Sequence, residues 1–180
     1  MDILIRKMTA ADQGRWAEID DSFTVDSTLV LTLKENEIGY TVKELPAYEK
    51  SYASDVEDTD YSRYIDNPDQ AVYLAFAANQ AVGQMVLKRN WNQYAYVEDL
   101  KVDNDFRGYG IGRQCIEQAK HWARERGMPG IMLETQSNNV SACKFYESCG
   151  FIIGGFDLCL YKGIHPQSEE VAVYWYLMFE

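Results

Sequence analysis

The stretch from Tyr94 to Trp122 constrains the fold more than any other part of the chain. Its first part, 94–102, is rich in aromatic and β-branched residues, which predicts a strand. Apolar residues over 111–126 recur close to the 3.6-residue period, which predicts an amphipathic helix. Between them lies Arg107-Gly-Tyr-Gly-Ile-Gly112. Glycines let a backbone come close to a ligand, and the first amides of a helix lack intrahelical partners. This pattern predicts a pyrophosphate site at the start of the helix.

Two other glycine-rich phosphate sites, the P-loop and the dinucleotide-binding turn, fit this sequence less well. A turn without a ligand is also compatible with the glycines. A P-loop requires Gly-Lys-Ser/Thr, whereas Gly112 is followed by Arg113. A dinucleotide-binding domain requires repeated βαβ units, which the chain lacks.

The length of 180 residues predicts one domain, 1–180, with a core that needs no disulfides. No apolar run approaches the roughly 20 residues of a membrane span. The first residues lack a charged segment followed by an apolar one, so no signal peptide is expected. Together these features predict a cytoplasmic protein.

The net charge of −11 and the pI of about 4.6 limit the partners of the chain. Such a field repels nucleic acid and anionic membranes and attracts cations, so we expect a cationic substrate and neither a nucleic-acid nor a membrane partner. The four cysteines lack zinc-ligand spacing, and most of them are expected to pack in the core. Only two histidines, His121 and His165, are present, and neither accompanies a ligand set, so no metal site is expected.

The rest of the chain predicts an α/β (α+β) fold. A helix capped by Thr9 is expected to reach about Ile19. Predicted strands lie at 2–7, 23–33, 40–45, 72–78, 81–88, 131–135, 151–161 and 171–179, and a second helix follows Asn139. The helix between strands 94–102 and 131–135 is a crossover, so these strands should run parallel. The last strand could close the monomer's own sheet or pair across a homodimer.

An acidic segment, 44–69, interrupts this pattern. It contains eight acids, two bases and four tyrosines, Tyr48, Tyr52, Tyr61 and Tyr64. A solvated loop with a short helix is one interpretation. The other is an insertion that attracts a polycationic substrate and stacks on it.

Two motifs in the same order resemble those of the GNAT superfamily of N-acetyltransferases. The first is Arg/Gln-x-x-Gly-x-Gly/Ala, matched by Arg107, Gly110 and Gly112. The second is Asn-x-x-Ala-x-x-x-Tyr-x-x-x-Gly-Phe, matched at every position by Asn139, Ala142, Tyr146, Gly150 and Phe151. This resemblance covers roughly 72–180. It implies a single domain with a mixed, mostly antiparallel sheet of six to seven strands flanked by helices, with parallel pairing at the strands that bind acetyl-CoA.

A narrower resemblance is to streptothricin acetyltransferases. It is carried by Trp91-Asn92, the segment 133–139, Cys149-Gly-Phe151, Ala172–Tyr176, and Tyr48 and Tyr52 with the acids that follow. It implies acetylation of an amino group on the β-lysine arm of the antibiotic, and thus resistance. Four alternatives stay open: a polyamine, aminoglycoside or protein-lysine acetyltransferase, and, outside the enzymes, an acyl-CoA-binding sensor or inactive relative. A tRNA-directed acetyltransferase disagrees with the negative charge.

The resemblance also implies site residues. Tyr146 is expected to protonate the departing thiolate, and Glu98 to act as the base through water. Asp99 and Glu134 are further carboxylate candidates, with Asp99 on the opposite face from Glu98 unless a β-bulge intervenes. The implied contacts to acetyl-CoA come from Leu100, Lys101, Val102, Arg107, Gly108, Tyr109, Gly110, Ile111, Gly112, Arg113, Asn139, Ala142 and Tyr146. The implied substrate contacts come from Asp58, Tyr61, Tyr94, Glu98 and Glu134.

Overall fold

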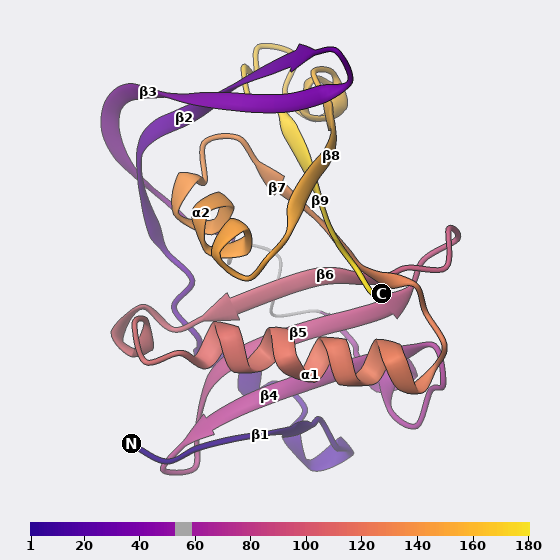
Figure 1. Ribbon diagram of the computed structural model, residues 1–180. Helices are drawn as coiled ribbons and strands as arrows, with labels where there is room; N and C mark the ends of the chain where they lie inside the picture. The colour runs from indigo at the N-terminus through magenta and orange to yellow at the C-terminus, as the bar shows by residue number, and fades with distance from the viewer. Residues whose placement is uncertain (53–58) are drawn as a thin grey trace. The chain divides into compact units, whose positions relative to one another are not determined.

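The structure, a computed structural model, describes residues 1–52 and 59–180, without the side chains of Ala17 and Glu18. Figure 1 shows the course of the chain. Its contacts group into two compact units. The first contains Met1–Phe23 and Ser51–Ile131, and the second contains Thr24–Lys50 and Met132–Glu180.

The first unit is built on an antiparallel sheet in the order β1-β4-β5-β6. The strands are β1 (Ile3–Lys7), β4 (Gln70–Ala77), β5 (Gln80–Arg89) and β6 (Ala95–Val102). Ala78 and Asn79 both have positive φ, 45° and 70°, as the tight turn of the predicted β4–β5 hairpin requires. After β6, helix α1 (Ile111–Glu125) leads into β7 (Gly130–Gln136), and β6 and β7 form the predicted parallel pair.

Helix α1 has the amphipathic stripe that its sequence predicts. The buried positions are Ile111, Cys115, Ile116, Ala119, Trp122 and Ala123. Removing such side chains from water stabilises the packed helix by roughly 1.5–3 kcal/mol for each large apolar group. Gly127 follows the helix with φ of 64°, a left-handed conformation that ends it and that favours glycine.

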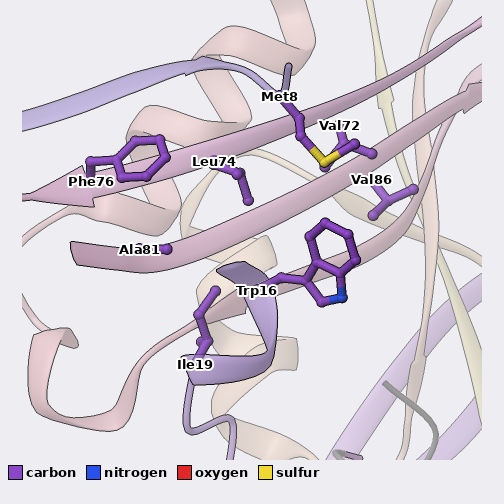
Figure 2. Close-up of a cluster of buried hydrophobic side chains, with 8 residues drawn as sticks. All are labelled: Met8, Trp16, Ile19, Val72, Leu74, Phe76, Ala81 and Val86. Carbon is purple, nitrogen blue, oxygen red and sulfur yellow. The ribbon is translucent and has the colours of Figure 1, made fainter. Parts of the chain in front are cut away.

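A second apolar cluster lies under the N-terminal segment (Figure 2). Its members are Met8, Trp16, Ile19, Val72, Leu74, Phe76, Ala81 and Val86. The predicted burial of Trp16 and Ile19 is confirmed, with 2% and 4% exposed. The single helix predicted from Thr9 to Ile19 is wrong: two 3-10 turns, η1 (Ala10–Asp12) and η2 (Arg15–Glu18), replace it. Gly14 has φ of 83° between them and breaks the helical path.

The second unit contains a three-stranded arrangement in the order β7-β9-β8 and a separate two-stranded ribbon. Its elements are β2 (Phe23–Lys34), β3 (Glu37–Lys50), α2 (Val140–Ser148), β8 (Ile152–Asp157), η6 (Leu160–Gly163) and β9 (Ala172–Met178). Strands β8 and β9 form the predicted antiparallel pair. Strand β3 is longer than the predicted 40–45 and extends into the acidic segment. Strand β8 ends before the predicted Tyr161, because Asp157 accepts hydrogen bonds from the following backbone and starts a turn.

These elements confirm the predicted α+β fold class, with a mixed, mostly antiparallel sheet of seven strands. Within the described ranges, no helix is both long enough and apolar enough to cross a bilayer. That all 180 residues act as one domain stays a prediction.

The Arg6–Asp12 pair gives a test of the N-terminal segment. Arg6 donates two hydrogen bonds to the nearly buried Asp12 carboxylate, at 2.7 and 2.8 Å, which holds the pKa of Asp12 well below its usual range. We expect Asp12→Asn to lower the free energy of unfolding by about 2 kcal/mol at pH 7. Because the folded-state pKa is depressed, this contribution is present above the unfolded pKa of about 3.9 and declines as pH falls below it.

Urea unfolding at pH 7 and pH 3 measures this difference, with the exposed Asp2→Asn as the matched control. A destabilisation that is equal at both pH values would contradict the ion-pair explanation.

Candidate active site

The glycine-rich turn lies where the sequence predicts it, at the start of α1. Gly108 and Gly110 have φ of 82° and 80°, and a side chain added at either would meet no other atom within 4 Å. Gly110 is the N-cap and offers no side chain to the first helical amides, those of Ile111, Gly112 and Arg113. A 15-residue helix thus begins with amides that no side chain caps, next to glycines that border open space. These features fit a pyrophosphate.

The side chain of Arg107 holds this turn rather than reaching into it. Its Nε donates to the carbonyl of Val102 at 3.1 Å, and its Nη1 donates to the carbonyl of Ser22 at 2.7 Å. Arg107 therefore fixes the path of the chain between β6 and α1, while its backbone remains part of the predicted turn. Tyr109 and Arg113 are exposed beside the open space.

Strand β6 supplies the other predicted acetyl-CoA residues and contains a β-bulge. Val86 of β5 pairs with Asp99, and Leu87 pairs with Val97, so Glu98 is the additional residue. Directly paired residues of antiparallel strands point to the same face. Asp99 therefore shares the face of the buried Val86. The prediction of opposite faces for Glu98 and Asp99 holds only for a regular strand. The bulge turns both carboxylates toward the face on which Tyr61 and Tyr64 pack.

Glu98 makes two strong contacts on this face. It accepts from Lys88 Nζ at 2.6 Å and from the Tyr64 hydroxyl at 2.8 Å. Burial raises the pKa of Tyr64 to about 12, and the bond to Glu98 adds to this effect. Glu98 is thus a paired carboxylate at the edge of the site, with its charge balanced by Lys88.

Asp99 has the environment of a proton acceptor. Burial raises its pKa to about 6, Lys101 lowers it, and Asp21 and Glu98 raise it. A carboxylate with a pKa near neutrality is ionised at pH 7 yet can take up a proton. Asp99 therefore combines a perturbed pKa with a place beside Glu98.

Tyr61 covers this part of the first unit. Its ring packs edge-on against Trp16, with 4.9 Å between centroids, and against Tyr64, with 5.4 Å. Burial raises the pKa of Tyr61, and the nearby Asp99 raises it further. Tyr94, another predicted substrate residue, lies in the turn before β6, while Asp58 lies outside the described residues.

In the second unit, Asn139 and Tyr146 are arranged by helix α2. The Asn139 side chain accepts from the backbone N–H of Ala142 at 3.2 Å and so caps the helix. Tyr146 is 7% exposed and lies edge-on to Phe145 and Phe151. Its ring is fixed by aromatic packing, which limits the directions that its hydroxyl can face.

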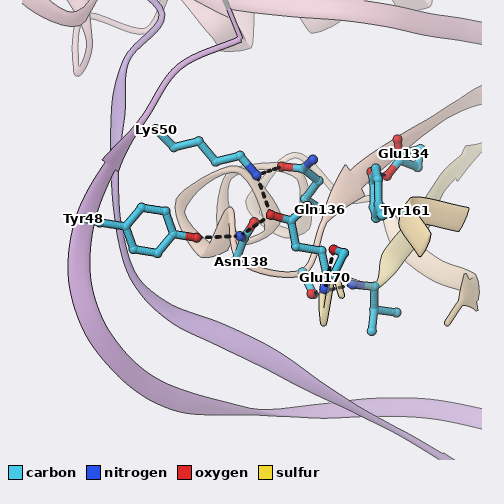
Figure 3. Close-up of polar contacts among 10 residues, drawn as sticks. Tyr48, Lys50, Glu134, Gln136, Asn138, Tyr161 and Glu170 are labelled. Atoms are coloured by element: carbon cyan, nitrogen blue, oxygen red, sulfur yellow. Dashed lines mark hydrogen bonds and ion pairs between the residues drawn. The ribbon is translucent and has the colours of Figure 1, made fainter. Parts of the chain in front are cut away.

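Glu134 of β7 is a half-buried carboxylate that accepts a hydrogen bond from Tyr161. Burial raises the pKa of Glu134, and the Tyr161 bond opposes this. The two side chains face one another in Figure 3. Tyr161 was not identified from the sequence, because it was assigned to a strand rather than to the η6 turn.

A polar network connects β3 to the end of β7 (Figure 3). Lys50 donates to Gln136 and to Glu170, both at 2.6 Å. Asn138 donates to Glu170 at 2.9 Å and to the Tyr48 hydroxyl at 3.1 Å. The network joins the ribbon to the end of β7. Sequence spacing could not have indicated it, since up to 120 residues separate the partners.

Within 1–52 and 59–180, no three His, Cys, Asp or Glu residues are placed to hold a metal ion. Cys115, Cys143 and Cys149 are buried. Burial raises the pKa of the Cys115 thiol to about 12 and that of Cys143 to about 11, as suits core residues.

Comparison with known proteins identifies the family. The model of the acetyltransferase (GNAT) family matches residues 41–151. The chain belongs to this family. It is therefore an acetyl-CoA-dependent acetyltransferase, as the sequence motifs predict.

Several relatives match over most of their length. Streptothricin acetyltransferase A of Bacillus subtilis (strain 168) is 33% identical over 98% of this chain and 100% of its own. Streptothricin acetyltransferase of Escherichia coli is 38% identical over 88% and 87%.

The fold also matches solved structures. A protein of Bacillus anthracis (strain Ames), provisionally named a streptothricin acetyltransferase and solved in complex with acetyl coenzyme A, is 53% identical. Its TM-score is 0.93, with 99% of this chain and 100% of that chain covered. A nourseothricin acetyltransferase is 26% identical, with a TM-score of 0.81 and 99% of both chains covered.

The two ends of α1 allow a controlled test of the turn. Gly110→Ala and Gly127→Ala both place a side chain at positive φ in open space, so each should destabilise the protein by about 1 kcal/mol. Only Gly110→Ala adds a methyl group beside the uncapped amides. We expect it to weaken acetyl-CoA binding roughly tenfold in isothermal titration calorimetry, about 1.4 kcal/mol. Equal affinities for the two variants would argue against a pyrophosphate at this turn.

Proposed function

We propose that this protein transfers an acetyl group from acetyl-CoA to an amino group on the β-lysine moiety of streptothricin, which inactivates the antibiotic. The observation that carries the proposal is the similarity to streptothricin acetyltransferases over nearly the whole chain. The paired carboxylates on one face of β6 and the net charge of −11 support a polycationic small-molecule acceptor. The cytoplasmic location, the lack of nucleic-acid and membrane partners, and a homodimer stay predictions.

The chemistry requires that the acceptor lose a proton. An alkylamine has a pKa of about 10 and is protonated at pH 7, so it has no free lone pair. We assign Asp99 as the base, because its carboxylate is ionised at pH 7 but has a pKa of about 6. Glu98, the base expected from the sequence, remains the alternative, although its carboxylate is already engaged by Lys88 and by the Tyr64 hydroxyl.

Proton flow then assigns the remaining roles. Acetyl-CoA supplies an acetyl thioester, whose C–S bond breaks as the C–N bond to the acceptor forms. Asp99 takes one proton from the ammonium group, and a second leaves the nitrogen as the amide forms. Tyr146 gives a proton to the thiolate and is reprotonated from water. One proton is released overall.

The uncapped α1 amides, with Gly108, Tyr109 and Gly110, would hold the pyrophosphate, and the backbone of 100–102 would hold the pantetheine arm. Two further predicted contacts, Asn139 and Ala142, belong to the same proposal. For the acceptor, Glu134, Tyr61, Tyr94 and Asp58 stay proposed contacts.

The acceptor is tested by measuring CoA release with a thiol reagent, using streptothricin and spermidine in parallel. We expect kcat/KM for streptothricin to exceed that for spermidine by at least about 100-fold, because the site should recognise more than one cationic group. Turnover with spermidine alone would replace the antibiotic by another cationic amine. Binding of acetyl-CoA without turnover of either amine would favour a sensor.

The base is tested by comparing Asp99→Asn with Glu98→Gln. In the wild type, kcat/KM should fall as pH drops below about 6, because protonated Asp99 cannot accept another proton. Asp99→Asn should lower kcat/KM by about 100-fold or more and remove this acidic limb. Glu98→Gln should retain the limb. The reverse pattern would assign the base to Glu98.

A further inference from the structure

Gln84 is a fully buried amide in an otherwise apolar part of β5. It is 0% exposed, pairs with the buried Leu74 of β4, and shares its face of the strand with Val86. Among the described residues, neither its Nε2 nor its Oε1 has a hydrogen-bond partner of ordinary geometry. Burying an amide without partners is unfavourable, so a Leu or Met would be the more stable choice if packing were the only requirement.

The neighbours of Gln84 are the groups assigned to the reaction. Gln84 pairs directly with Lys101 of β6, and Val86 pairs with Asp99, so all four side chains share one face. The amide is close enough to the Tyr61 hydroxyl to lower the pKa of that phenol, whereas the Asp99 carboxylate raises it. Tyr61 also packs against the apolar cluster that contains Val86, the β5 partner of Asp99. Since Gln84 has no exposed surface, it can affect a substrate only through a neighbouring side chain, and the Tyr61 hydroxyl is one polar neighbour.

We propose that Gln84 is a positioning residue for acetyl transfer: its side-chain N–H donates to the Tyr61 hydroxyl oxygen, which directs the hydroxyl hydrogen toward the Asp99 carboxylate. A hydroxyl that accepts one hydrogen bond becomes a better donor for the next, so the three groups act as a chain. The hydrogen bond from Tyr61 would orient the carboxylate and favour its ionised form. This inference rests on the proposed function, because it assumes that Asp99 is the base.

The other charged groups near Asp99 define what the chain must adjust. Lys101 on the same strand favours the carboxylate, while Glu98 and Asp21 oppose it. Asp21 is itself engaged, since it accepts from Ser51 at 2.7 Å. The proposed hydrogen bond from Tyr61 depends on the amide behind it, so removing the amide should leave the effects of Lys101, Glu98 and Asp21 unchanged.

The experiment uses Gln84→Met, which keeps the side-chain volume and removes both polar atoms, together with Tyr61→Phe and the double variant. We expect Gln84→Met to lower kcat/KM for streptothricin about tenfold and to move the acidic limb upward by about half a pH unit, with the acetyl-CoA KM unchanged. The double variant should be no worse than Tyr61→Phe, because Gln84 acts through that hydroxyl. Gln80→Met, on the exposed start of β5, is the matched control and should resemble the wild type.

A readout without substrate separates this inference from the proposed function. The carboxyl ¹³C resonance of Asp99, identified by its loss in Asp99→Asn, should titrate at a higher pH in Gln84→Met and in Tyr61→Phe than in the wild type. If the wild type fails to acetylate streptothricin, the proposed function falls, and this titration still tests the chain. An unchanged titration, or losses that multiply in the double variant, would overturn the role of Gln84 whatever the acceptor.

Discussion

The β-bulge in β6 determines how the first unit presents its chemistry. In a regular strand, Glu98 and Asp99 would point to opposite faces, and one of them would lie under α1. Because the bulge leaves Glu98 unmatched, both carboxylates face the cover formed by Tyr61 and Tyr64. Two neighbouring acids then lie on one face but have different partners. Glu98 is paired with Lys88, and Asp99 is more deeply buried, with a pKa near neutrality.

This separation of roles follows from burial and pairing rather than from residue type. A close cation stabilises the charged form of a carboxylate and makes it a weaker proton acceptor. A partly desolvated carboxylate accepts a proton more readily. Both kinds stand side by side on one strand, so two neighbouring acids on one face differ in how readily they accept a proton.

The second unit relies on contacts between segments that are distant in sequence. Lys50, Asn138 and Glu170 form one network with four charge-assisted or amide hydrogen bonds to the ribbon and to β7. Helix α2, in contrast, is specified locally by its Asn139 cap and by the positive φ of Gly150. The aromatic neighbours of Tyr146 then fix its ring.

Local signals in the sequence determined much of this protein. The glycine-rich turn, the stripe of α1, the Asn139 cap and the alternation of the β4–β5 hairpin each arise from residues close together, so the elements, the family and the acetyl-CoA turn could be predicted. The N-terminal helix was predicted wrongly, because one glycine at positive φ outweighed the Thr9 cap.

Only the tertiary structure decided which groups meet. The bulge depends on the pairing of β5 with β6, the environment of Asp99 depends on what covers it, and the partners of Lys50 come from other parts of the chain. The one sign of Gln84 in the sequence is a single polar residue within the apolar stretch 81–87. Its meaning depends on Tyr61, which is 23 positions earlier in the chain and reaches it only through folding.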